Sequence, residues 1–223
     1  MTSSYYSATP ALTWRDAAAT RILGSAVSWF GFALSFTLLF QVSFSVMALG
    51  GSCASGGPYE IAVQCPDAVA AFAPGSIFMG LFAVAIGMFF ARGFGTPLTT
   101  WAWPILFCGL GGLFLAAFFA AGEVVGLIIG LMFEIMGIIP LILEFRGSPQ
   151  RVFLGQRAAN GAQFYEGERA RRSLMSPRTP NPEGAVRPNA GHWLLALGIT
   201  AVCSLLGYWV AGVWFASVAS SGS

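Results

Sequence analysis

The chain has 223 residues, of which 56% are apolar and 14% aromatic, whereas only 9% are charged. An ordinary soluble domain carries about 25% charged residues, so a water-soluble globule of this composition would lack a polar surface. The composition excludes such a globule. It predicts an all-α integral membrane protein, because the apolar residues come in blocks of about 20 or more, enough to cross the hydrocarbon core as helices.

The first part of the chain predicts two membrane spans. A polar cytoplasmic segment, residues 1–21, precedes a first span at residues 22–49, which is long enough to remain in the membrane as a signal anchor. A second span is expected at residues 76–91, after a Gly- and Pro-rich outer loop at residues 50–75.

The longest apolar block, residues 101–145, predicts two further spans. As one helix its 45 residues would reach about 68 Å, more than twice the hydrocarbon core, so the block has to fold back on itself. The expected turn is AAGE, residues 120–123, where a glycine and a charge interrupt the apolar pattern. Spans one to four then form one transmembrane region, residues 22–145.

The last part of the chain predicts an inner loop and a fifth span. Within the loop, residues 146–192, the string QRAANGAQFYEGERARR is compatible with an amphipathic helix. The fifth span is expected at residues 193–216, followed by a Ser- and Gly-rich outer tail at residues 217–223.

Arginine placement predicts the orientation of these spans. All basic residues are arginines: two precede span one, one follows span two, and eight lie in the inner loop, while the outer loop and the 120–123 turn contain none. Cytoplasmic loops are enriched in Lys and Arg. With five spans every arginine falls on one side, so we expect the N-terminus inside and the C-terminus outside. Four or six spans would break this pattern.

Two cysteines of the outer loop predict a disulfide. Cys53 and Cys65 lie twelve positions apart, in a segment that the topology places in an oxidising compartment. Closing a loop this short contributes about 3 kcal/mol in the chain-entropy model. A metal-binding pair is the alternative, but two cysteines without a nearby His or further Cys make a poor zinc site. Cys108 and Cys203 are expected to be small apolar filler within spans.

The outer-loop string GGSCASGGPYEIAVQCP resembles loops of uncharacterised actinobacterial multi-spanning membrane proteins. The resemblance covers this string alone. It implies no activity, and it favours a bacterial plasma membrane as the location.

The inner loop carries eight arginines and three glutamates, which allows two interpretations. The arginines are contacts for anionic lipid headgroups, at about 1 kcal/mol for each well-placed side chain, or they are only the positive-inside signal. Nucleic-acid binding is not expected, because no known fold or aromatic platform accompanies them. The single histidine, His192, is expected at the interface. The candidate headgroup contacts are Arg146, Arg151, Arg157, Arg169, Arg171 and Arg172.

Span four contains an acid at the membrane midplane. Glu134 lies in the string MFEIMG, where a charged side chain costs about 2.5 to 3.5 kcal/mol on insertion scales. Gly126 and Gly130 precede it at four-residue spacing, Gly137 follows, and Glu123 begins the same face at the outer turn. Glycine faces mark close helix approach, so Glu134 is expected to face protein and not lipid.

This acid has two interpretations. In the first, Glu134 and Glu123 form a proton or cation site, most simply in a ring of identical chains around one pore. No internal repeat supports a transporter built from two related halves. In the second, Glu134 is a packing acid, hydrogen-bonded to a polar side chain on another span. The candidate partners are Ser35, Gln41, Thr200 and Tyr208.

The function expected first is an accessory or scaffold subunit that packs in an oligomer or a larger complex, and the alternative is a proton- or cation-conducting channel or transporter. Small-residue ladders that include Gly87 in span two and Gly112 in span three favour tight packing. HExxH, GxSxG and P-loop motifs are missing from the sequence, so no enzyme, metal or cofactor is expected. The expected partners are the lipid bilayer and other membrane chains or further copies of this one.

Overall fold

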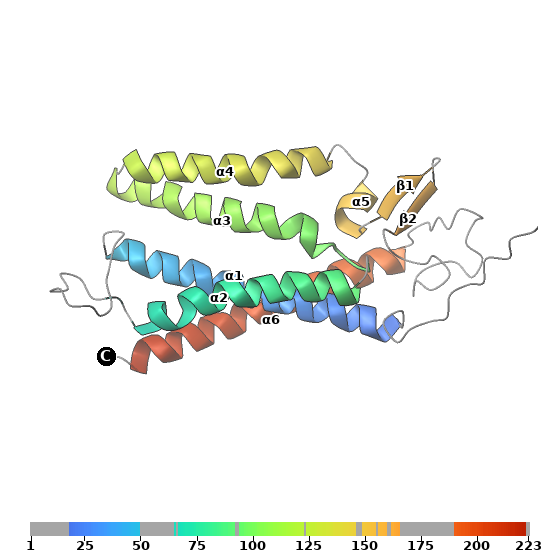
Figure 1. Cartoon of the computed structure of the whole chain (residues 1–223), viewed down its shortest axis with the longest axis horizontal. Helices are drawn as coiled ribbons and strands as arrows, with labels where there is room; N and C mark the ends of the chain where they lie inside the picture. Colours follow the sequence, from blue (N-terminus) through green and yellow to red (C-terminus); the bar gives the residue numbers. More distant parts are fainter. Residues whose placement is uncertain are drawn as a thin grey trace, which may run out of the picture.

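The protein folds as an all-α multi-pass membrane protein, as the sequence predicts. The computed structural model describes residues 18–49, 65, 67–91, 94–122, 124–145, 149–154, 156–159, 162–165 and 190–221. Five helices in this part of the chain are long and apolar enough to cross a membrane. They are α1 (Ala18–Ala48), α2 (Asp67–Ile86, continued by the π-helical turn η2, Gly87–Ala91), α3 (Leu98–Ala121), α4 (Val124–Phe145) and α6 (Ala190–Ser221) (Figure 1).

Helix α1 is the centre of a three-helix bundle. It packs along α2 on one side and along α6 on the other. Two contacts show how close the helices come: a methyl group added at Gly24 would lie 2.7 Å from backbone atoms of η2, and one added at Gly207 would overlap the carbonyl oxygen of Phe30. Such small residues permit the close backbone approach that drives helix packing in lipid. The bundle core is formed by Leu34, Leu38, Val42, Phe72 and Ala211.

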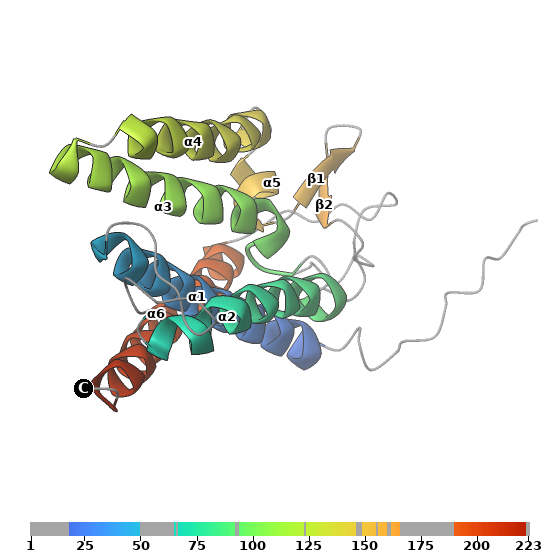
Figure 2. The ribbon, with the colours of Figure 1, turned by 60° about the vertical axis from the view of Figure 1, so that its left-hand side comes forward.

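Helices α3 and α4 form an antiparallel hairpin beside this bundle. Gly122 ends α3 with a φ of 74°, a left-handed conformation that favours glycine, and its backbone N–H donates to the carbonyl oxygen of Phe118 at 2.7 Å. The predicted turn at residues 120–123 is therefore confirmed. Figures 1 and 2 show α4 on the side of α3 that faces away from α1, α2 and α6.

The ends of the helices differ from the predicted span limits. Helix α1 begins at Ala18 and so includes Arg21, α2 begins at Asp67 rather than at residue 76, and α6 runs from Ala190 to Ser221. The apolar pattern marks the part of a helix in hydrocarbon, whereas the hydrogen-bonded helix continues beyond it: the 31 residues of α1 extend about 46 Å, against a core of roughly 30 Å.

The inner loop contains structure that the sequence pattern does not predict. A short helix α5 (Pro149–Leu154) is followed by strands β1 (Gln156–Ala159) and β2 (Ala162–Tyr165), which pair antiparallel with Gln156 opposite Tyr165. The expected amphipathic helix over this stretch is therefore wrong. Between the strands the sequence has Asn160 and Gly161, the dipeptide most typical of a two-residue hairpin turn.

Candidate functional site

The candidate site is built on the glycine face of α4. A methyl group added at Gly137 would lie 2.5 Å from the Sγ atom and 3.0 Å from the backbone nitrogen of Cys108 on α3. One added at Gly130 would lie 2.8 Å from the Cγ atom of Leu115, and one at Gly126 would lie 3.1 Å from a backbone oxygen of α3. The three glycines therefore lie against α3 of the same chain.

Glu134 lies on this face and packs over α3. A methyl group added at Gly111 would lie 3.0 Å from both the backbone nitrogen and the Oε1 atom of Glu134, so the acid lies over the bare backbone of Gly111. The Cys108 thiol lies beside the Glu134 carboxyl group. The side chain is half-buried. Glu134 thus has its polar contact inside its own hairpin.

The expected partners of Glu134 on other spans do not lie beside it. Helix α4 packs against α3 and makes at most marginal contact with the described residues of α1 and α6, which carry those partners. Ser35 instead donates to the carbonyl oxygen of Phe32 at 2.8 Å, and the ring of Tyr208 is 64% exposed. The Gln41 Oε1 and Thr200 Oγ1 atoms are buried and have no hydrogen-bond partner in the described part of the chain.

The sequence contained a signal for the true contact. In a hairpin with a short turn, residues equally far from the turn face each other. Around the turn at residues 122 and 123, this rule pairs Glu134 with Gly111, Gly137 with Cys108 and Gly130 with Leu115, which are the contacts in the structure. The expected partners of Glu134 lie on spans one and five, although the short turn already brings α3 against α4.

The two other packing glycines lie in different surroundings. A methyl group added at Gly87 would lie 3.3 Å from the Cβ and Oγ atoms of Ser28, so Gly87 lies against α1. Gly112 is exposed on α3, and a methyl group added there would have as its nearest neighbour the Oε1 atom of Glu134, at 3.9 Å. Gly111 takes the packing position instead. The carboxyl group of Glu134 therefore lies next to the exposed side of the hairpin.

Several predicted site residues cannot be placed. Glu123, Cys53, Arg146, Arg169, Arg171 and Arg172 lie outside the described residues. Arg151 belongs to α5 and Arg157 to β1, and only their backbone is described. Cys65 is disulfide-bonded, while Cys108 and Cys203 are free thiols. The pairing of Cys65 with Cys53 stays a prediction.

An aromatic cluster that the sequence pattern does not reveal holds the short helix α5. The Trp101 Nε1–H group donates to the carbonyl oxygen of Val152 at 3.0 Å. The Phe153 ring lies with its centroid 5.5 Å from Trp101, 6.0 Å from Phe145 and 6.3 Å from Trp193. Helix α5 therefore joins the ends of α3, α4 and α6.

The histidine lies in the same region, near the start of α6, and its side chain is buried against protein. His192 is fully buried, and its ring stacks on Phe94 with the ring centroids 6.4 Å apart. The Trp29 Nε1–H group donates to the carbonyl oxygen of Thr96 at 2.9 Å, which fixes the segment that leads into α3. Within the described ranges no group of three or more His, Cys, Asp or Glu side chains could hold a metal ion.

Comparison of the chain with protein-family models, with curated proteins and with solved structures gives no match. The class that the fold defines is a multi-pass membrane protein with a two-helix hairpin beside a three-helix bundle.

Proposed function

We propose that the protein is an accessory or scaffold subunit of a membrane assembly, and that α4 is the surface on which other helices dock. One observation carries this proposal. Twelve large apolar residues of α4 are exposed, and seven of them recur at alternating spacings of four and three, which is the repeat of a helix–helix seam. These residues, called the α4 seam below, are Val124, Ile128, Leu131, Ile135, Ile138, Ile142 and Phe145.

The side chains of the α4 seam are suited to packing against a helix as well as to contact with lipid. Four of its seven residues are isoleucines and one is a valine, whose β-branched side chains have one preferred rotamer in a helix and so lose little entropy on packing. The glycine face of the same helix is already occupied by α3, so a second helix has the seam available to it.

Site-specific photo-crosslinking in native membranes tests this proposal. A benzophenone amino acid replaces Ile135 in the seam or, as a control, Val202 on α6; both side chains are 56% exposed. We expect adducts of discrete mass from position 135 and none from position 202. An adduct of twice the chain mass identifies a second copy, and another mass identifies a different subunit. Equal labelling at the two positions would contradict the proposal.

The orientation and location belong to the same proposal. The segregated arginines and the five spans support an N-terminus inside and a C-terminus outside. The resemblance of the outer-loop string supports a bacterial plasma membrane. The inner arginines would then face anionic headgroups of the cytoplasmic leaflet.

A proton- or cation-conducting channel is the second candidate, and one observation favours it. The Glu134 carboxyl group lies in the middle of α4, next to the exposed Gly112, where a second chain in a ring would meet it. Flux into vesicles that contain the purified protein tests this idea. Loss of flux in Glu134→Gln with normal assembly would support conduction, whereas unchanged flux in Glu134→Gln together with lost assembly in Ile135→Ala, a change in the α4 seam, would support the scaffold.

A further inference from the structure

Helix α4 contains a proline that leaves one backbone carbonyl group without its helical partner. Pro140 lies inside α4. In an unbroken α-helix the N–H group of residue 140 donates to the carbonyl oxygen of Met136, four residues earlier. Proline has no N–H group, and its ring pushes that carbonyl oxygen aside. The Met136 carbonyl group therefore has to find a donor outside α4.

An indole on α3 is this donor. The Trp103 Nε1–H group donates to the carbonyl oxygen of Met136 at 3.1 Å. Phe107, one turn further along α3, packs against the indole with the ring centroids 4.3 Å apart. Phe107 also meets Phe133 of α4 edge-on, with the centroids 5.5 Å apart. The hydrogen bond thus joins α3 to α4 at the carbonyl group that Pro140 leaves open.

The surroundings make this hydrogen bond more important than an average one. Trp103 and Met136 both belong to helices that are apolar and long enough to cross a membrane, and they are 49% and 37% exposed. Lipid offers no water that could replace a lost donor, so an unpaired carbonyl group is costly there. Loss of the indole N–H group would therefore weaken α4 at this point.

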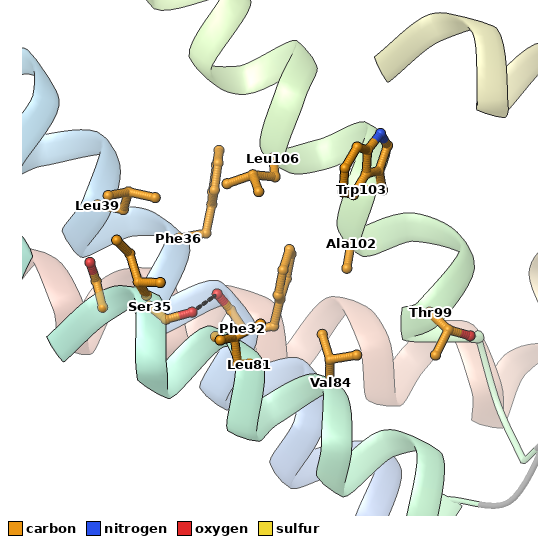
Figure 3. Close-up of a pocket in the computed structure, with 13 residues that line it drawn as sticks. Phe32, Ser35, Phe36, Leu39, Leu81, Val84, Thr99, Ala102, Trp103 and Leu106 are labelled. Carbon is orange, nitrogen blue, oxygen red and sulfur yellow. Dashed lines mark hydrogen bonds between the residues drawn. The ribbon is translucent and has the colours of Figure 1, made fainter. Parts of the chain in front are cut away.

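The indole also has room to turn away from α4. Figure 3 shows Trp103 at the edge of an apolar cleft between α1, α2 and α3, with its ring nitrogen on the side away from α1 and α2. The cleft has a volume of about 330 Å³ and adjoins the ring, so this side of the ring is not packed against protein. The hydrogen bond to Met136 can open without displacing a packed side chain.

We propose that Pro140 and Trp103 form a hinge and its latch. Pro140 weakens α4 after Met136, and the Trp103 indole holds the second half of α4 to α3. The α4 seam crosses this point, with Ile135 before the break and Ile138 after it, so the latch sets how the two halves of the seam line up. The latch consists of contacts within one chain and does not depend on the proposed scaffold function.

Hydrogen–deuterium exchange of the full-length protein in detergent tests the latch. The amides of residues 141–145, which follow the break, report its opening. Trp103→Phe keeps an aromatic ring beside Phe107 but removes the N–H donor, so the Met136 carbonyl group loses its partner. We expect these amides to exchange about tenfold faster, which corresponds to about 1.4 kcal/mol.

The same substitution in a Pro140→Ala background separates the latch from packing. Alanine at this position restores the N–H donor inside α4, so the Met136 carbonyl group keeps a partner when the indole is removed. In this background we expect Trp103→Phe to raise the exchange rate no more than about twofold. A ring that only fills space would have the same effect in both backgrounds. Equal effects would therefore overturn the proposal, as would unchanged exchange in Trp103→Phe alone.

Two control variants exclude general destabilisation. Pro74→Ala removes the proline of α2 and leaves the Met136 carbonyl group as it is, so Trp103→Phe should still raise exchange about tenfold in that background. Trp209→Phe removes an indole on α6 that is 65% exposed, and it should leave residues 141–145 unchanged. Loss of the tenfold effect with Pro74→Ala, or an equal rise in Trp209→Phe, would overturn the latch.

Discussion

At the scale of single residues, the close contact between α3 and α4 depends on glycines, which have no side chain to hold the two helices apart. Gly137 meets the backbone nitrogen of Cys108, which cannot move aside as a flexible side chain can. We expect Gly137→Ala to lower the free energy of unfolding by about 1 to 3 kcal/mol, the usual cost of overpacking. Thermal unfolding in one detergent, followed by near-UV circular dichroism, measures this change.

Gly112 provides the control for this prediction. It lies on the same hairpin but is exposed, with its nearest neighbour 3.9 Å from an added methyl group. Gly112→Ala should leave the free energy of unfolding unchanged or raise it by up to about 1 kcal/mol, because alanine favours a helix over glycine. Equal effects of the two substitutions would show that the α3–α4 contact is looser than described.

The disulfide of Cys65 gives a second prediction at the scale of single residues. We expect Cys65→Ser to lower the free energy of unfolding by about 3 kcal/mol if the partner is Cys53, because the closed loop is short. Cys203→Ser, which removes a free thiol, should have a small effect. Alkylation of the unfolded chain without reduction should label Cys108 and Cys203 only. Labelling of all four cysteines would contradict the prediction.

At the scale of elements, α5 is held by aromatic contacts and one hydrogen bond. Phe153→Ala removes ring contacts with Trp101, Phe145 and Trp193. Burying a Phe side chain contributes about 1.5 to 3 kcal/mol, so α5 should open about ten to a hundred times more often. The rate of tryptic cleavage after Arg151 measures this opening. Phe119→Ala, at a ring that is 79% exposed, should leave the rate unchanged.

The elements show which part of the fold the sequence could predict. The five spans follow from apolar blocks that are long enough to cross the hydrocarbon core, and the α3–α4 turn follows from the glycine and the charge that interrupt one block. The helix ends could not be predicted in this way, because hydropathy records the surrounding solvent and not the hydrogen bonds of the helix. Helix α5 and the strands β1 and β2 are short and polar enough to give no periodic signal.

The candidate site could be predicted from the sequence only in part. The spacing of Gly126, Gly130 and Glu134 indicates a face that meets another helix, and the structure has that face against α3. Which residue of α3 lies opposite Glu134 is set by the register of the hairpin. Sequence spacing within α4 contains no information on that register, but the distance of Glu134 and Gly111 from the shared turn does.

At the scale of the whole molecule, the two helical units are joined at one end. The aromatic cluster around α5 and the buried stack of Phe94 on His192 lie where α3 begins and α4 ends, whereas the α3–α4 turn lies at the opposite end beside the end of α1 (Figure 1). Between these ends the hairpin touches the bundle through the first half of α3. Ala102 and Ile105 pack against the cluster of Trp29, Phe32 and Ala83, and Phe36 packs against Gly109. A hairpin anchored in this way can present α4 to another chain without disturbing the α1–α2–α6 core.

The arrangement of the whole chain in the membrane gives the last prediction. An odd number of spans places the two ends on opposite sides, and the arginines indicate that the N-terminal side is cytoplasmic. Alkaline phosphatase is active only outside the cytoplasm, and green fluorescent protein folds only inside it. Phosphatase fused after residue 223 should therefore be active and fluorescent protein dark. Fusions after residue 189, before α6, should give the opposite result, because only four spans precede them. The same signal at both positions would show that α6 does not cross the membrane.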